Sequence, residues 1–170
     1  ILLFALAMPQ VSCFAGDLLY VTNSNRDTVS VIDGERGVVV REVEVGAEPC
    51  DIAIDPKGEL IAGSHEERRG EVSFLNRKDL YIQSRTLLVE PGDGRASCFY
   101  LAFSSESKKL YAANRYSGSL FVVDVQKALV VKEISLPHGK DFRLEGAVLS
   151  PDGTLLYLPN GVGKEILVVD

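Results

Sequence analysis

The sequence predicts an all-β protein, built from about four repeated units of four-stranded antiparallel sheet. Three observations carry this prediction. Short runs rich in Val, Ile, Leu and Tyr are bounded by Gly, Pro, Asn and Asp, which is typical of strands and turns. These runs recur with a period in the forties. Helical periodicity of any length is absent, so a fold with packed helices is not expected.

The repeat is carried by two alternating segment types. The first ends in a small or polar residue and occurs four times, as L-L-Y-V-T-N (Leu18 to Asn23), E-L-I-A-G-S (Glu59 to Ser64), K-L-Y-A-A-N (Lys109 to Asn114) and L-L-Y-L-P-N (Leu155 to Asn160). The second is an apolar run that ends at Asp33, Asn76, Asp124 and Asp170, at intervals of 43, 48 and 46 residues. A period of this size with four strands per unit is the signature of a β-propeller blade.

Each expected strand follows from this pattern. The first blade has three, Leu18–Asn23, Thr28–Asp33 and Val38–Val45. The second has Asp51–Asp55, Leu60–Ser64, Glu71–Asn76 and Ser84–Val89. The third has Phe99–Ser104, Lys109–Asn114, Ser119–Asp124 and Leu129–Leu136. The fourth has Glu145–Ser150, Leu155–Asn160 and Glu165–Asp170. Many runs are apolar on both faces, which suits sheets stacked face to face. We expect an arc with exposed edges at both ends, which aggregates or dimerises.

Three recurring signatures resemble the YVTN β-propeller repeat, within the WD-repeat-like and quinoprotein amine dehydrogenase-like propellers. They are Y-V-T-N from Tyr20, V-S-V-I-D from Val29 and S-P-D-G from Ser150. The resemblance covers about residues 17–170 and is specific for fold. Blades of this family usually come in sevens, so the resemblance implies that about half of a ring is missing from this sequence.

The N-terminal segment predicts export. Residues 1–8 are uncharged and apolar, and a small-residue stretch follows, so residues 1–15 are interpreted as a secretory signal, truncated at its start and cleaved after Ala15. The apolar run is too short for a membrane span. Residues 16–170 are then a partial propeller, incomplete at its C-terminus, in the periplasm or outside the cell. A lipoprotein anchor at Cys13 is a weaker alternative.

Composition excludes several classes of function. Eighteen basic and twenty-four acidic residues give a net charge of −6, which argues against a nucleic-acid partner. No C-x-x-C, C-x-x-C-H, H-E-x-x-H or G-x-S-x-G motif is present, so no zinc, covalent haem or serine-nucleophile site is expected. No cofactor and no metal is predicted.

Two cysteines remain after the predicted cleavage, Cys50 and Cys98, in a compartment that permits disulfides. Both lie at the start of neighbouring innermost strands. Cys98 aligns with Pro49 rather than with Cys50, so strand alternation points the two side chains to opposite sides of their sheets. We therefore expect them not to pair.

The candidate ligand site is the channel mouth, where inter-blade loops and the starts of innermost strands meet. Its predicted residues are Asp51, Arg95, Tyr100, His138, Arg143 and Glu145. Loops on a rigid scaffold commonly carry function, and this mixture suits a polar or anionic ligand. A pairing of Arg143 and Glu145 with their neighbours is the structural alternative. His65 opens a charged loop in the same set, where a merely solvated side chain is the more common outcome. The Asp and Asn that end strands are expected to cap turns.

Three functions are consistent with these residues. The first is an exported binding or scaffold module for a protein or a small ligand, without catalysis. The second is a propeller enzyme or enzyme subunit, resembling lactonases, amine dehydrogenases or d-type-haem proteins. There His138 would act as base or haem ligand, Arg143 as anion clamp and Glu145 as general acid or base. The third is a cell-surface adhesion array. Fold alone does not decide among them.

Overall fold

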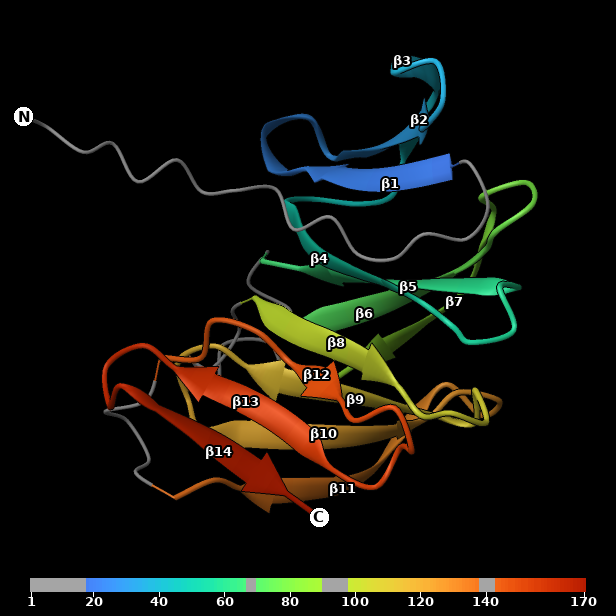
Figure 1. Ribbon diagram of the computed structural model, residues 1–170. Coiled ribbons are helices and arrows are strands. Elements are labelled where there is room, and N and C mark those ends of the chain that lie inside the picture. The colour runs from blue at the N-terminus through green and yellow to red at the C-terminus, as the bar shows by residue number, and fades with distance from the viewer. Residues whose placement is uncertain (1–17, 67–69, 90–97, 138–142) are drawn as a thin grey trace, which may run out of the picture.

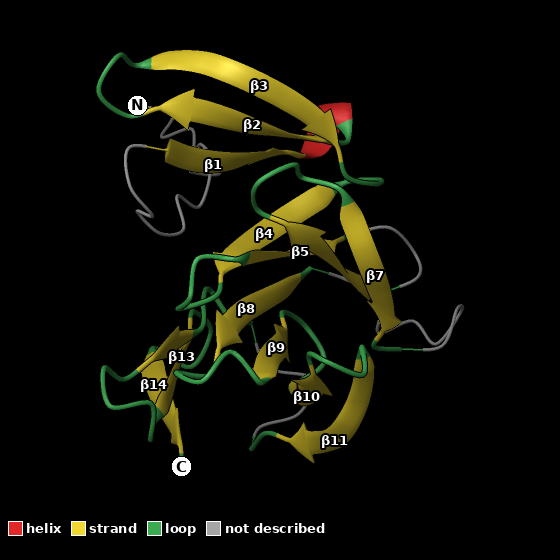
Figure 2. Ribbon diagram, turned by 90° about the vertical axis from the view of Figure 1, so that its right-hand side faces the viewer, coloured by secondary structure: helices red, strands yellow, loops and turns green. Residues whose placement is uncertain are grey.

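A computed structural model describes residues 18–66, 70–89, 98–137 and 143–170. Within them the chain forms four antiparallel sheets that follow one another along the sequence (Figure 1). Successive sheets pack face to face and curve into an arc (Figure 2). The predicted all-β fold, a propeller fragment of about four blades, is confirmed.

We number the sheets as blades in chain order. Blade 1 has β1 (Leu18–Asn23), β2 (Thr28–Asp33) and β3 (Val38–Glu44). Blade 2 has β4 (Pro49–Ile54), β5 (Leu60–His65), β6 (Glu71–Asn76) and β7 (Ile82–Leu87). Blade 3 has β8 (Phe99–Phe103), β9 (Lys109–Asn114), β10 (Ser119–Asp124) and β11 (Leu129–Ser135). Blade 4 has β12 (Val148–Leu149), β13 (Leu156–Asn160) and β14 (Glu165–Val169). A three-residue 3-10 helix, Ser24–Arg26, is the one helical turn in the described part of the chain.

Most strands lie within one residue of the expected bounds, and three differ by more, of which β4 starts at Pro49 instead of Asp51. Strand β7 starts and ends two residues earlier than predicted. Strand β12 has only two residues, although Leu144 forms an isolated bridge to Asn160 just before it. Gly146 lies between that bridge and Val148, where a residue without a side chain weakens a strand.

Three apolar clusters hold the blades together, one in each interface between neighbours. The cluster between blades 1 and 2 includes Tyr20, Val31, Ile52 and Ile61. The cluster between blades 2 and 3 is built around Phe74, Phe99, Phe103 and Phe121. In it Phe99 and Phe121 meet edge to face, with ring centroids 5.9 Å apart. The cluster between blades 3 and 4 includes Ala102, Leu120, Leu144, Leu156 and Leu158. Strands buried on both faces explain the runs of apolar residues without alternation.

Turns between strands use the polar residues that end each second apolar run. Asp33 Oδ1 accepts the backbone N–H groups of Glu35 and Arg36, at 3.1 and 2.8 Å. Asn76 and Asp124 accept N–H groups in the corresponding turns of blades 2 and 3. The prediction that these residues cap turns is confirmed at all three positions.

The same irregularity occurs in the outer half of three blades. The register between the two outermost strands shifts between Val31 and Ile32, between Phe74 and Leu75, and between Val122 and Val123. These are matching positions of the repeat, so a β-bulge belongs to the blade design. A bulge bends its strand and increases the local twist.

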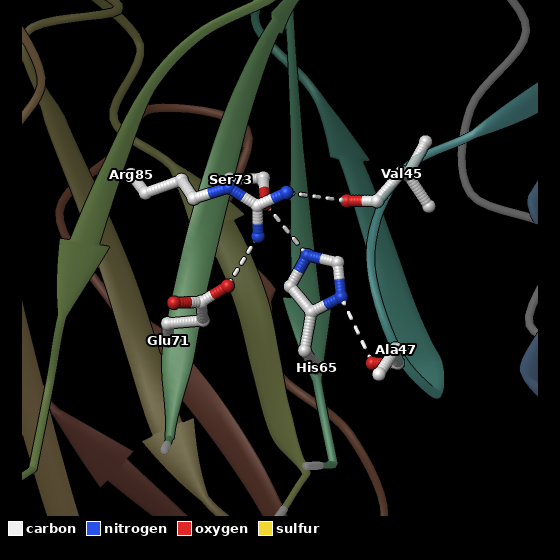
Figure 3. A network of polar contacts seen from close by, with 6 residues as sticks. All are labelled: Val45, Ala47, His65, Glu71, Ser73 and Arg85. Atoms are coloured by element: carbon white, nitrogen blue, oxygen red, sulfur yellow. Dashed lines mark hydrogen bonds and ion pairs between the residues drawn. The ribbon is translucent and has the colours of Figure 1, made fainter. Parts of the chain in front are cut away.

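His65 is not in a solvated loop, as the sequence suggested, but ends β5 and is buried. Its Nδ1 lies 3.2 Å from the carbonyl oxygen of Ala47, and its Nε2 lies 2.7 Å from Ser73 Oγ (Figure 3). In the neutral ring, Nδ1–H donates to the carbonyl and Nε2 accepts from the hydroxyl. Gly46, at φ 117°, allows this approach, because a Cβ there would lie 3.2 Å from His65 Cε1. This histidine ties the blade 1–2 connection to blade 2.

The outer face of blade 4 is apolar and exposed. Cross-strand pairing puts Val148, Tyr157 and Val168 on one face, together with Pro159 and Ile166. Val148, Ile166 and Val168 are 62%, 63% and 55% exposed. In blades 1 to 3 the corresponding face is covered by the next blade.

We predict that the chain self-associates through this face. Ile166→Lys combined with Val168→Lys should lower the apparent mass in light scattering toward that of a monomer, because charge opposes burial of the face. Val131→Lys, an exposed valine on β11, is the matched control and should change nothing. If Val131→Lys lowered the apparent mass as much as the double variant does, the prediction would be contradicted.

Candidate functional site

Strand register gives three predicted site residues the same position in consecutive blades. Asp51 pairs with Ser64, and Tyr100 pairs with Ala113. Glu145 N–H donates to the Pro159 carbonyl oxygen at 3.0 Å. The three partners Ser64, Ala113 and Pro159 occupy the same place, one residue before the end of β5, β9 and β13. Asp51, Tyr100 and Glu145 therefore lie side by side at the channel mouth, which is the end of the sheets where β4 and β8 begin. Arg95 and His138 lie outside the described residues.

Asp51 is a buried carboxyl group at the junction of blades 2 and 3. It is 3% exposed, and its Oδ2 accepts the backbone N–H of Leu101 on β8 at 2.7 Å. Its Oδ1 is also buried and has no hydrogen-bond partner in the described part of the chain. Burial raises the pKa of Asp51 to about 7, and backbone N–H groups of Leu101 and Ile52 only partly oppose this.

Tyr100 lies at the centre of a charged cluster. It is 6% exposed. Burial is the main cause that raises the pKa of its hydroxyl, and the positive charge of Arg115 opposes the shift. The negative charges of Glu145 and Asp51 raise the pKa further. These effects require that the side chains of Tyr100, Arg115, Glu145 and Asp51 share one region.

Arg143 and Glu145 form an ion pair on the surface of this cluster. Arg143 Nε lies 2.8 Å from Glu145 Oε1. This hydrogen bond raises the pKa of Arg143, and the charge of Glu145 adds to the effect. Both side chains are substantially exposed, so the pair adds little to stability. The pair joins two residues of one segment, so it does not by itself tie one blade to another.

Two residues that sequence reasoning did not single out complete the cluster. Arg115 and Tyr116 follow β9, and the Arg115 guanidinium carbon lies 5.2 Å from the centroid of the Tyr116 ring. Arg115 N–H donates to Cys98 O at 3.1 Å, and its carbonyl accepts Leu144 N–H at 3.0 Å. Its Nε is buried without a hydrogen-bond partner among the described residues. Both residues follow β9 at the end of the sheet where Tyr100 pairs with Ala113, so the register of the strands brings them to the mouth.

The prediction that Cys50 and Cys98 stay apart is wrong. They form a disulfide between blades 2 and 3, with Cα atoms 5.9 Å apart. Neither cysteine lies in a regular stretch of strand, so the alternation of side chains does not apply to them. The register shifts between Pro49 and Asp51, so Cys50 lies at a β-bulge, and Cys98 precedes the first residue of β8. A bulge re-aims a side chain relative to a regular strand.

The described residues hold no group of three or more His, Cys, Asp and Glu side chains arranged to bind a metal ion. Among these residues, no helix has the length and apolar character that crossing a bilayer requires. The mouth lies at the junction of blades 2, 3 and 4. It contains two guanidinium groups, two phenol rings and two carboxyl groups, from Arg115, Arg143, Tyr100, Tyr116, Asp51 and Glu145.

Taken together, the stacked sheets of three or four strands and the mouth at the starts of the innermost strands define an arc of a β-propeller. Among solved structures, the chain is similar to hydrazine synthase of Kuenenia stuttgartiensis, which contains a β-propeller, with a TM-score of 0.69 and 22% identity. The match covers 85% of this chain and 41% of that one, so the chain spans less than half the length of that relative. At this identity the similarity shows the fold alone. No protein-family model and no curated protein matches the chain.

Proposed function

We propose that the chain is part of an exported β-propeller of the YVTN-repeat type, whose channel mouth binds a small organic anion. The observation that carries the proposal is the cluster around Tyr100, where the charges of Arg115 and Arg143 both act on a largely buried phenol. The Nε of Arg115 is buried without a hydrogen-bond partner among the described residues. Guanidinium groups and a hydroxyl donor are the side chains that bind carboxylates and phosphates. Arg143 is balanced by Glu145, and Arg115 supplies a net positive charge as long as Asp51, whose pKa is raised to about 7, holds its proton.

Two further observations support export and this repeat type. The Cys50–Cys98 disulfide is favoured in oxidising compartments, which agrees with a secretory signal in residues 1–15 and a periplasmic or extracellular location. The Y-V-T-N residues end β1, and the V-S-V-I-D residues lie in β2, as the repeat requires.

Calorimetric titration with acetate, succinate and phosphate tests the binding proposal, with acetamide as the uncharged comparison for acetate. Arg115→Ala and Arg143→Ala should each weaken binding of the preferred anion about tenfold or more, since a hydrogen bond to a charged group contributes about 1.5–3 kcal/mol. His138→Ala is expected to act in the same direction.

The thermal midpoint of Arg143→Ala should stay nearly unchanged, because Arg143 is exposed. Lys132→Ala, on the outer strand β11, is the control cation and should bind like the unchanged protein. If the arginine variants bind the anion normally but are less stable, both arginines have a structural role. Binding of acetamide as tight as acetate would also contradict an anion site.

One observation favours the second candidate, a propeller enzyme. Asp51 has a pKa of about 7 and lies beside Tyr100, and a general acid or base works best when its pKa is near the working pH. Under this alternative, Asp51→Asn abolishes turnover of a substrate while ligand binding persists. Under the leading proposal, the unchanged protein binds its ligand and shows no turnover that Asp51→Asn could remove.

A further inference from the structure

A cavity of about 650 Å³ lies between blades 1 and 2, at the end of the sheets opposite the mouth. Leu18 and Tyr20 of β1 form one wall, and residues 58–60 of the β4–β5 turn form another. Residues 76–78 and Gln83 complete the lining. Its volume is in the range of small-molecule sites, which is about 300–1,000 Å³.

The inner wall of the cavity is fixed by Arg77. Its Nε donates to the Tyr20 hydroxyl at 3.2 Å, and its Nη1 donates to the Gly58 carbonyl at 3.1 Å. The guanidinium carbon also lies 6.0 Å from the centroid of the Tyr20 ring. Gly58 has φ +70°, and a Cβ there would lie 3.1 Å from Nη1. A side chain at this position would be strained by the positive φ and would push the guanidinium slightly aside.

The corresponding position of blade 3 does not carry this arrangement. Arg77 follows the last residue of β6, and the residue that follows β10 in blade 3 is Val125. Val125 packs against the apolar cluster between blades 2 and 3. At the interface between blades 1 and 2, the cation Arg77 therefore occupies the position that the apolar Val125 has in blade 3.

The lining has an apolar part and a positively charged part. Leu18, Leu60 and the Tyr20 ring provide apolar surface. Lys78 is exposed on the rim, and no described carboxylate lies within ion-pair distance of its ammonium group. Among the described lining residues, Lys78 and Arg77 are two cations, and Glu59 is the one carboxylate. Excess positive charge beside apolar surface is complementary to an anion that carries an apolar body.

We propose that the cavity between Tyr20 and Arg77 is a second binding site, separate from the mouth, for an amphipathic organic anion such as an aromatic carboxylate or sulfonate. The anionic group lies near Lys78 and Arg77, and the apolar body lies against Leu18 and Leu60. The proposal does not depend on ligand binding at the mouth.

The test uses 1-anilinonaphthalene-8-sulfonate, an aromatic sulfonate whose fluorescence reports binding. Lys78→Glu should weaken binding about tenfold or more, because it reverses one of the two charges. Gln83→Trp should also weaken it by at least that factor, because an indole on exposed β7 fills the cavity. Lys127→Glu is the matched control in the corresponding turn of blade 3 and should leave the affinity unchanged.

The exposed face of blade 4 is an alternative binding place for this probe, so the titration is repeated with Ile166→Lys combined with Val168→Lys. In the protein with both lysine substitutions, the part of the probe binding that Lys78→Glu weakens should remain. The proposal is overturned if Lys78→Glu and Gln83→Trp, folded by circular dichroism, bind the probe as tightly as Lys127→Glu. It is also overturned if the Ile166 and Val168 changes remove all of the binding.

Discussion

Removing the Cys50–Cys98 disulfide should lower the free energy of unfolding by about 4 kcal/mol. A cross-link across 48 residues restricts the unfolded chain, and the loop-entropy relation gives a loss of this size. For a chain of this length, that corresponds to a fall of roughly 10 °C in the thermal midpoint. Denaturant unfolding of Cys50→Ala combined with Cys98→Ala measures the effect.

Reduction provides the control. A reductant should destabilise the unchanged protein by a similar amount and have no effect on the double variant. Ligand binding at the mouth should weaken as well, because Cys98 accepts the backbone N–H of Arg115 and Cys50 directly precedes Asp51. Two reactive thiols in the oxidised, folded protein, at Cys50 and Cys98, would contradict the prediction.

Asp51 should make the protein less stable as the pH rises from about 4 to about 7. Its pKa is about 7 in the folded state and near 3.8 in the unfolded chain. Between these values the folded state holds a proton that the unfolded state has lost, so unfolding becomes easier as the pH increases. Three pH units correspond to at most about 4 kcal/mol. The stabilisation is complete below about pH 4 and lost above about pH 7.

Asp51→Asn should remove this dependence, because the amide keeps an oxygen acceptor for Leu101 N–H and does not ionise. Denaturant unfolding of both proteins at several pH values gives the difference. Asp152→Asn is the control, since hydrogen bonds from Ser150 and Thr154 lower the pKa of Asp152. That carboxylate contributes stability that is lost as the pH falls, the opposite sign. Parallel stability curves for the unchanged protein and Asp51→Asn would show that Asp51 does not titrate as stated.

The repeat made the blades predictable, because each apolar run and each capping Asp or Asn marks a strand end in the sequence itself. The disulfide was not predictable in the same way. Its geometry depends on a bulge at Cys50 and on the chain before Phe99, and strand alternation describes neither. Arg115 was missed for a related reason. Its neighbours Tyr100 and Glu145 come from other strands, and blade packing alone brings them together. His65 was assigned to a loop because nothing in the sequence shows that Ser73 and Ala47 meet it.

The bulge that recurs in blades 1, 2 and 3 has a consequence for how copies of this chain meet. Strands β3, β7 and β11 are the rim edges of their sheets, and each offers unpaired backbone groups to a strand from another molecule. A flat edge would serve as a template for growing a sheet across molecules. The bulge next to each of these edges twists the strand away from that geometry. At these three edges, contacts between copies are thereby directed away from backbone pairing, which charged substitutions cannot block. They are directed to side-chain faces, where a few charged substitutions can block them.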